Sequence, residues 1–357
     1  MIKFPEPKSS VPEFLSPTAA NDLLACPYRL AWRLDPAFKN LRRPNTWVAL
    51  GIIAHGVVEE AARGLLVNIG TKEVARKRVE VLWEDLAGEA EHDLEVAWRP
   101  MHPPPPREWP GYHLTRTRVI RRCLRQWERS GVITARSVSA LQIEEAMSDG
   151  VTGIAGRPDR VEGPSGNRCV VDLKTGLRQE RPTETQRRQL LMYAHLVART
   201  SGDLPARIAI EDASGRRWEE PIDAREVDDA VQEVRRGLKQ YRASVEHNSL
   251  KLLASPGADT CGWCNYKSVC EPYWNNLDAS WGHGSVAGVV ASVDAAPSGS
   301  LLEIMAESPV DATGTWLVSS TPADTPGVGA AISVTEAEIT EAPQQLRFRW
   351  FTNLVEL

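Results

Sequence analysis

The feature that most limits how this chain can fold is a change in hydrophobic spacing near residue 137. Before it, apolar residues recur at helical spacing, whereas residues 137–174 contain segments in which apolar and polar residues alternate. Alternation places successive side chains on opposite faces of a strand, while helical spacing gathers them on one face. The chain therefore passes from helices into a sheet, and the sequence predicts an α/β fold.

The same periodicities give an expected order of elements. Helices are expected at 16–33, 47–66, 71–95, 112–130, 183–200 and 223–247, and strands at 137–146, 151–162, 167–174 and 206–212. In the first helix Ser16 is a suitable N-cap, and Pro27 should kink or end the helix because proline has no backbone N–H to donate.

Residues 285–357 differ in character from the rest. They are rich in small and β-branched residues, with alternating segments such as SVAGVVASV and GTWLVSS. This pattern predicts a small all-β module, a five-stranded barrel of the OB type. We expect two domains, at 1–280 and 281–357.

Composition excludes several classes of protein. The chain is 42% hydrophobic and 25% charged, as in soluble globular proteins, and it has no run of 18 apolar residues that could span a membrane. Its N-terminus has no apolar signal core, so we expect a cytoplasmic protein. It contains no P-loop motif, so the motor of any helicase partner would be another polypeptide.

The most informative segment is GIAGRPDRVEGPSGNRCVVDLKTG, residues 153–176. A turn at Gly163–Gly166 would form a hairpin and bring Asp159 close to Asp172. Asp172 and Lys174 are two positions apart and so share one face of their strand. Two carboxylates at one end of a sheet suit a hard divalent cation, and a lysine beside them can hold an attacking water.

Together with two helical segments, this hairpin resembles the PD-(D/E)XK nuclease superfamily, in particular its RecB-type branch. The resemblance rests on His55 in LGIIAHGVVEE, Asp159 in GRPDR, Asp172-Leu173-Lys174 in VVDLKTG, and Gln189-Leu-Leu-Met-Tyr193, all in the family's order. It covers roughly residues 16–275 and implies a restriction-endonuclease-like core with a mixed central sheet flanked by helices.

The resemblance also implies a role for each matching residue. Asp159, Asp172 and the Leu173 carbonyl would bind Mg²⁺ or Mn²⁺, and His55 would ligate or stabilise a metal from the helical side. Lys174 would position the nucleophilic water. Gln189 and Tyr193, one turn apart on a helix, would orient the phosphodiester or Lys174.

The second motif consists of cysteines. Cys261, Cys264 and Cys270 lie in DTCGWCNYKSVC, a spacing suited to a metal cluster or a zinc site. With Cys26 far upstream as a fourth ligand, the arrangement resembles the iron–sulfur nucleases of this branch, including AddB and the CRISPR-adaptation exonucleases. That resemblance favours a [4Fe-4S] cluster, with zinc as the alternative. Cys169 lies among valines and is expected to be buried.

The sequence leaves the path of DNA open. Arginines are dense in the helix at 112–130 and around residues 178–188, and phosphate contacts come mainly from such residues. Arg118, Arg122, Arg178 and Arg187 are therefore candidates, although a solvated basic surface explains them equally well. Trp109, Tyr112 and Trp127 are either stacking surfaces for bases or core residues.

The charge of the barrel complicates its role. Residues 285–357 carry nine acidic residues and two arginines, a net charge of −7, whereas the whole chain has a net charge of −5. OB-type barrels often bind single strands, but an acidic one is a poor phosphate binder. Docking to a protein, or mimicry of DNA that gates the nuclease, is an alternative.

These observations lead to a functional expectation. The chain is expected to be a metal-dependent DNA nuclease, acting as an exonuclease on single-stranded DNA or DNA ends in repair or phage defence. The alternative is a nucleic-acid-binding or scaffold subunit of a helicase–nuclease or defence complex, with little activity alone and a protein partner docked through residues 281–357.

Overall fold

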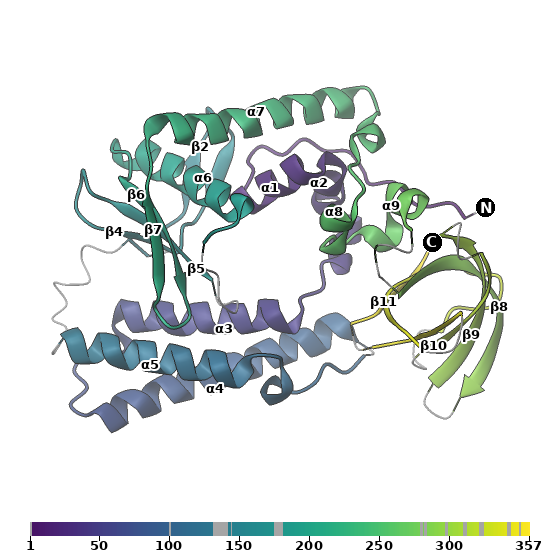
Figure 1. The fold of residues 1–357 in the computed structure, drawn as a ribbon, viewed down its shortest axis with the longest axis horizontal. Coiled ribbons are helices and arrows are strands. Elements are labelled where there is room, and N and C mark those ends of the chain that lie inside the picture. Colours follow the sequence, from purple (N-terminus) through teal and green to yellow (C-terminus); the bar gives the residue numbers. More distant parts are fainter. Residues whose placement is uncertain are drawn as a thin grey trace.

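The structure is a computed structural model in which helices pack on both faces of a mixed sheet and a β-barrel lies at one end of the molecule (Figure 1). It describes residues 2–99, 101–130, 142–143, 145–174, 181–278, 281, 284–296, 299–309, 313–320, 325–340, 344–349 and 351–357. The structure confirms the predicted mixed sheet flanked by helices.

The first part of the chain is helical, as expected. Its helices are α1 (Pro17–Ala25), α2 (Pro27–Leu34), α3 (Thr46–Glu60), α4 (Lys72–Trp98) and α5 (Tyr112–Ser130). Ser16 caps α1 by accepting a hydrogen bond from the Ala19 amide. The predicted helix at 16–33 is two helices, because Cys26 is extended and Pro27 opens α2 at a position that needs no amide hydrogen.

Five strands form the central sheet in the order β1-β4-β5-β6-β7. They are β1 (Gln142–Ile143), β4 (Arg160–Glu162), β5 (Cys169–Lys174), β6 (Arg207–Asp212) and β7 (Arg217–Pro221). The β5–β6 pair is parallel and the other pairs are antiparallel. The parallel pair requires a crossover, and α6 (Glu184–Ser201) provides it.

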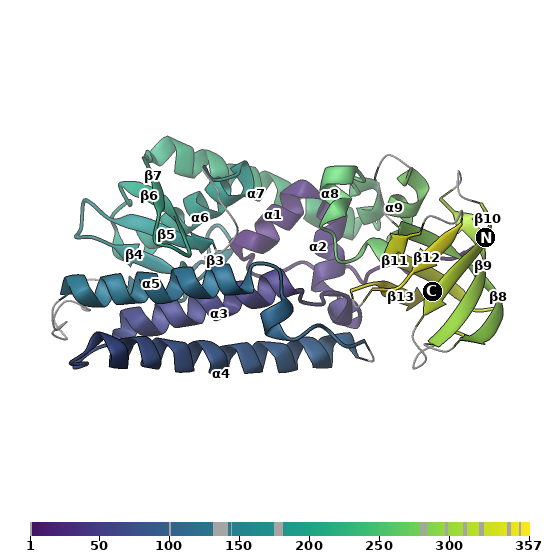
Figure 2. The same ribbon diagram turned by 60° about the horizontal axis from the view of Figure 1, so that its bottom comes forward.

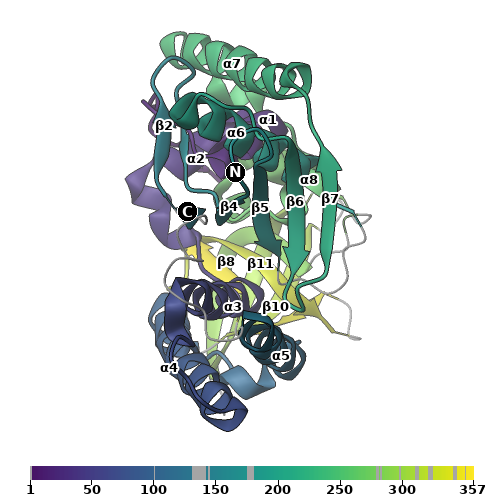
Figure 3. The same ribbon diagram turned by 90° about the vertical axis from the view of Figure 1, so that its left-hand side faces the viewer.

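Helices cover both faces of this sheet (Figure 3). On one face α6, α1 and α7 (Ala224–Glu246) share a hydrophobic core with Val170 and Ile208 of the sheet. On the other face α3 and α5 share a core with Leu173, and α4 packs beyond them (Figure 2). Because helices cover both faces, β5 is buried at every position except the half-buried Lys174, rather than at alternate positions.

Two strand predictions need correction. The predicted strand at 151–162 is two strands in different sheets: β3 (Ile154–Gly156) pairs with β2 (Met147–Asp149), and β4 joins the central sheet. Pro158 lies between them, and a proline cannot donate to a strand ladder. Of the predicted strand at 137–146, residues 142–143 form β1 and 145–146 are not in a strand, while 137–141 and 144 lie outside the described residues.

Residues after α7 form short helices around the late cysteines. These are η5 (Leu250–Leu253), α8 (Ala258–Gly262), η6 (Lys267–Val269) and α9 (Glu271–Asn276). Their side chains pack against α2 and the first residues of the chain, where Phe4 stacks on Trp274 with ring centroids 6.1 Å apart. Segments from opposite ends of the sequence therefore meet at the cysteines.

The last part of the chain is a closed five-stranded barrel, as predicted. It consists of β8 (Gly284–Ala296), β9 (Gly299–Ser308), β10 (Gly314–Ser320), β11 (Ala331–Ile339) and β12 (Gln345–Arg347), with β13 (Asn353–Glu356) attached to β11. Pairings run from β8 through β9, β10, β12 and β11 back to β8, and only β10–β12 is parallel. Alternate side chains such as Val286, Ile304 and Val318 fill its core.

The barrel packs directly on the cysteine segment (Figure 1). The buried Lys267 of η6 forms an ion pair with Glu336 on β11. The Tyr273 hydroxyl donates to Ser285 Oγ at 3.2 Å, and Ser308 donates to a carbonyl of α9 at 3.0 Å. None of the helices described here is long and apolar enough to cross a membrane.

Candidate active site and cysteine cluster

The predicted hairpin is present and forms one wall of the site. β4 and β5 are antiparallel, with Arg160 opposite Val171 and Glu162 opposite Cys169. Gly163 opens the turn with φ of 90°, and a side chain there would meet the Asn167 carbonyl oxygen 2.6 Å from its Cβ. Only glycine tolerates both conditions, so the GPSG segment fixes the hairpin register.

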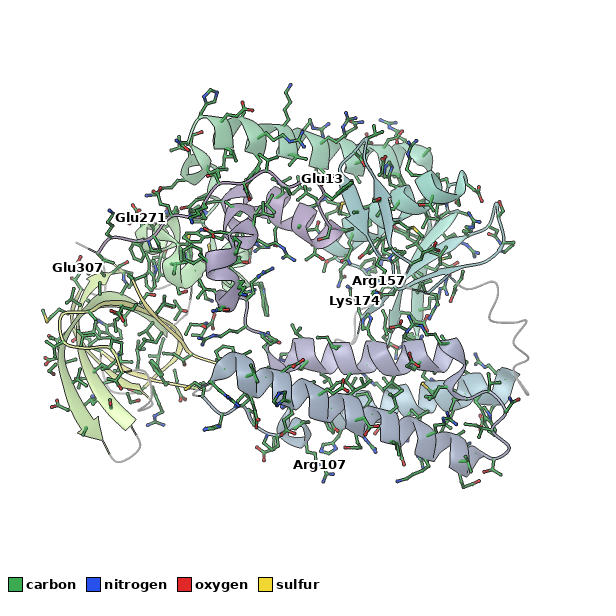
Figure 4. The ribbon with its side chains drawn as sticks, turned by 180° about the vertical axis from the view of Figure 1, so that it is seen from behind. Glu13, Arg107, Arg157, Lys174, Glu271 and Glu307 are labelled. Carbon is green, nitrogen blue, oxygen red and sulfur yellow. The ribbon has the colours of Figure 1, made fainter. Side chains whose placement is uncertain are left out.

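This register brings the two aspartates and the lysine together. Asp159, directly before β4, accepts a hydrogen bond of 2.7 Å from the Leu173 amide on β5. Lys174 Nζ lies 2.8 Å from Asp172 Oδ2, as expected for residues on one face of a strand. Figure 4 shows Lys174 at the end of the sheet near α3.

The charges of the site are poorly compensated. Burial raises the pKa of Asp159, and the neighbouring Asp172 carboxylate raises it further, whereas His55, the Leu173 amide and Lys174 oppose the shift. Asp172 is 3% exposed. Two carboxylates held this close in a buried site favour either a shared proton or a bound cation.

His55 reaches the hairpin from α3. Its Nε2 lies 2.7 Å from the Leu173 carbonyl oxygen, and its Nδ1 lies 3.6 Å from Asp159 Oδ2. A carbonyl only accepts hydrogen bonds, so in this arrangement Nε2 carries the proton and donates it. Three predicted metal-site residues therefore meet at one point, with the imidazole between a carbonyl and a carboxylate.

Gln189 and Tyr193 lie on α6, on the opposite side of Asp172. Gln189 Nε2 donates to Asp172 Oδ1 across 3.4 Å. Burial raises the pKa of Tyr193 to about 12, although its hydrogen bond with Gln189 opposes the shift. Gly156 makes room for the ring, because a Cβ there would lie 2.9 Å from Tyr193 Cε1. The four predicted segments thus converge on the β4–β5 hairpin, α3 through Asp159 and Leu173 and α6 through Asp172.

The donor set partly fits a divalent cation. Asp172 Oδ2 is buried, with the Lys174 ammonium 2.8 Å away as its counter-charge. The neighbouring carboxylates of Asp159 and Asp172 carry more negative charge than that one ammonium offsets, and carboxylate oxygens are the ligands that a hard cation prefers. However, no three His, Cys, Asp or Glu side chains within the described ranges converge closely enough to hold a metal ion. The carboxylates fit, and His55 is turned toward the Leu173 carbonyl.

Three charged residues near the site were not singled out from the sequence. Arg157 lies close enough to Tyr193 to affect its pKa, and it appears beside Lys174 in Figure 4. Arg160, next to Asp159, forms an ion pair with Glu211 at the end of β6. Glu211 and Arg160 line a small cavity together with His55 and Asp159. The GRPDR segment was a usable signal for both arginines, but nothing in the sequence marked Glu211.

The predicted DNA-binding arginines have different surroundings. Arg122 is buried and pairs with Glu211 at 2.7 Å. Arg187 pairs with Glu220 and Glu226, so it connects α6 to β7 and α7. Arg118 is half-buried on α5, and Arg178 lies outside the described residues.

The aromatic residues of α5 and the segment before it belong mainly to the core. Trp109 and Tyr112 are each 2% exposed, and Trp127 is half-buried against the same hydrophobic cluster. Of the two interpretations open at the sequence level, packing therefore applies to Trp109 and Tyr112, and neither presents a face for stacking bases.

The four predicted cluster cysteines line one cavity. Cys26 lies between α1 and α2, Cys261 lies in α8, Cys264 lies between α8 and η6, and Cys270 lies between η6 and α9. All four are free thiols. The Ser255 amide donates to Cys26 Sγ at 3.5 Å, and Arg29 and Lys267 line the same cavity.

These thiols are in an environment that disfavours thiolates. Burial raises the pKa of Cys264 to about 12, and it also raises the pKa of Cys261 and Cys270, with the neighbouring sulfurs adding to each shift. Cys123 and Cys169 are buried elsewhere, in α5 and β5, as expected for Cys169. Four thiols around one cavity, three of them unfavourable as isolated thiolates, fit a cofactor that takes up their charge.

Comparisons with known proteins add the family. No curated protein matches this chain. The solved structure titled "Crystal structure of SSO0001" is 15% identical, covering 61% of this chain and 96% of that one, with a TM-score of 0.24. The model of the family described as the PD-(D/E)XK nuclease superfamily matches residues 14–271, which include all four active-site segments and the four cysteines. The chain therefore belongs to the PD-(D/E)XK nuclease superfamily.

Proposed function

We propose that this protein is a metal-dependent nuclease that hydrolyses the phosphodiester bonds of DNA. The observation that carries the proposal is the buried Asp172 carboxylate, which is 3% exposed, has the Lys174 ammonium 2.8 Å from its Oδ2, and lies within the residues that the family model matches. Asp159, whose pKa burial raises, lies across the hairpin from it. Both features are expected of a site built to receive positive charge.

Asp159, Asp172 and the Leu173 carbonyl would hold Mg²⁺ or Mn²⁺, with His55 beside them. His55 Nε2 donates to the Leu173 oxygen across 2.7 Å, so the imidazole would orient the carbonyl that helps to hold the ion. When bound, the ion would stabilise negative charge on the phosphate and the leaving oxygen.

The remaining residues of the site orient the reactants. Lys174 projects its ammonium beside Asp172 and can hold a water for attack on phosphorus while offsetting phosphate charge. Gln189 braces the opposite oxygen of Asp172, and Tyr193 in turn interacts with Gln189. In this scheme Lys174 is catalytic, and the α6 pair positions Asp172 and the phosphodiester.

We further propose that the four cysteines hold a [4Fe-4S] cluster. The four sulfurs line one cavity, and burial disfavours the free thiolate at Cys261, Cys264 and Cys270, which supports a metal cofactor that takes up thiolate charge. Four thiolates also suit tetrahedral zinc, and the resemblance to the iron–sulfur nucleases favours the cluster. The cluster would tie Cys26 to the segment beyond residue 260 and stabilise the folded chain.

The barrel is proposed to be of the OB type and to act as a separate docking domain, residues 281–357. Its strand order and its single parallel pair, β10–β12, support this assignment. Its net charge of −7 disfavours phosphate binding. A protein partner, such as a helicase or a defence-complex subunit, is the occupant that its charge favours, and the chain would then act on single strands or DNA ends in repair or defence.

The decisive experiment mixes the purified protein with linear single-stranded, linear duplex and covalently closed circular DNA in the presence of Mg²⁺, Mn²⁺ or EDTA. Metal-dependent cleavage that is lost in Asp172→Ala and Lys174→Ala supports the proposal. Digestion of linear but not circular substrates supports an exonuclease. Absence of cleavage with every metal, or cleavage that these variants retain, contradicts the proposal, and binding without cleavage would instead support a scaffold subunit.

A further inference from the structure

A second and larger cavity adjoins the carboxylate site. Its volume is about 670 Å³, and it lies between α5, the end of β6 and the turn that leads into β7. Six arginines line it: Arg122, Arg125, Arg129, Arg160, Arg216 and Arg217. Glu162 and Glu211 are its only described acidic residues, so the lining has a net charge of +4.

The two carboxylates are already engaged with the arginines at the base of the cavity. Glu211 pairs with Arg122 and Arg160, and Glu162 pairs with Arg160 and Arg217. Arg122 is 7% exposed, so this base is a fixed, buried network rather than a solvated surface. It therefore supplies a rigid platform whose own charges are paired.

The outer arginines are in a different state. Arg129 at the end of α5 and Arg216 in the β6–β7 turn are both exposed. Within the part of the chain that the structure describes, neither guanidinium has an ion pair or a hydrogen bond. Their positive charge is thus available to a ligand, and planar guanidinium groups bind phosphate oxygens through paired hydrogen bonds.

The arginine cavity shares a wall with the small cavity that contains His55 and Asp159. Val58, Ala62, Arg160 and Glu211 line both this cavity and the small cavity that contains His55 and Asp159. Arg160 follows Asp159 directly in the chain. The start of β4 therefore contributes Arg160 to the ion-paired base of the arginine cavity and Asp159 to the small cavity. An anion in the arginine cavity would therefore lie next to the part of the site that contains His55 and Asp159.

We propose that the arginine cavity binds backbone phosphates of the DNA strand next to the phosphate that is cleaved, with Arg129 and Arg216 making the contacts. This inference rests on the proposed nuclease function and adds a substrate-binding subsite to it. Because such contacts are to the backbone, they would strengthen binding to every sequence equally.

The test measures the anisotropy of a labelled single-stranded oligodeoxynucleotide bound to the Lys174→Met protein, in which cleavage does not interfere. Arg129→Gln, Arg216→Gln and the double variant are titrated at several salt concentrations. The matched control is Arg225→Gln on α7, a 90% exposed arginine that lines neither cavity. Each lost phosphate contact lowers the log–log salt slope by about 0.7 for a single strand.

We expect the double variant to bind DNA at least tenfold more weakly with a salt slope lower by about 1.4, and Arg225→Gln to behave as the unsubstituted protein. Unchanged affinity and slope in the double variant overturn the proposal. The proposal is also overturned if these arginines are needed for saturable binding of inorganic phosphate or a mononucleotide but not for DNA binding. It is likewise overturned if the double variant loses affinity only for an RNA oligonucleotide.

The outcome is separable from that of the nuclease proposal. In the cleavage assay on the Lys174-containing protein, the double variant should raise KM with little change in kcat. If no protein cleaves DNA but the double variant still loses binding, the nuclease proposal fails and the subsite stands. If cleavage occurs with an unchanged KM in the double variant, the subsite fails and the nuclease stands.

Discussion

The contact between Lys174 and Asp172 allows the catalytic and structural roles of Lys174 to be separated. Asp172 has a side chain only 5% exposed, and its Oδ2 has the Lys174 ammonium at 2.8 Å as its counter-charge. Lys174→Met keeps the length of the side chain and removes the charge. It leaves a buried carboxylate whose nearest described donor is Gln189, at 3.4 Å from the other oxygen.

The size of the effect follows from burial. Removing one partner of a fully buried ion pair costs about 3–5 kcal/mol, whereas exposed pairs contribute less than about 1 kcal/mol. Lys174 is 30% exposed, so we expect Lys174→Met to lower the free energy of unfolding of the metal-free protein by about 2 kcal/mol. Asp172→Asn in the same protein removes the stranded charge and should restore most of that loss.

The assay is urea unfolding of the four proteins of this double-mutant cycle in EDTA, followed by nuclease activity in Mg²⁺. We expect a coupling energy of about 2 kcal/mol and a rate at least 100-fold below that of the unsubstituted protein in every variant. The control is Lys72→Met, which breaks the exposed Lys72–Glu128 pair and should change stability by less than about 0.5 kcal/mol. Equal destabilisation by Lys174→Met in both Asp172 backgrounds would refute the reasoning, because the charge of Asp172 would then be irrelevant.

Three other predictions follow from the surroundings of single residues. Cys264→Ser should abolish the visible absorption and iron content of anaerobically purified protein, whereas Cys123→Ala, outside the cavity, should leave both unchanged. Glu336→Gln should lower the free energy of unfolding by about 2 kcal/mol in thermal or urea melts, because it leaves the buried lysine of η6 without its counter-charge while Glu336 itself is 31% exposed. Burial acts to raise the pKa of Asp149, but hydrogen bonds led by that from His195 lower it to about 2. Asp149→Asn should therefore be less stable than the unsubstituted protein at neutral pH, and the difference should shrink as the pH falls below about 4 toward 2, as measured by urea unfolding at several pH values. A difference that is constant with pH would contradict the assigned hydrogen bonds.

Much of the fold was predictable because its signals are local. The helices from α3 to α7 follow from their apolar spacing, and the β4–β5 hairpin follows from glycines that only a turn accommodates. The strand at 151–162 was wrongly predicted as continuous because its alternation continues through Pro158, whose missing amide hydrogen outweighs the pattern. β7 was missed because its sequence, RWEEP, is polar and lies at the edge of the sheet.

The candidate site divides in the same way. The sequence by itself determined the order of the motif residues, because spacing along one hairpin and one helix is a local property. It likewise determined the family and the positions of the four cysteines along the chain. Only the tertiary structure decided that Glu211 from β6 anchors Arg122 and Arg160 beside the carboxylates. It also decided that the barrel rests on the cysteine segment through Lys267. These contacts join elements distant in the chain, and their energies depend on burial and charge at the meeting point, which no sequence spacing encodes.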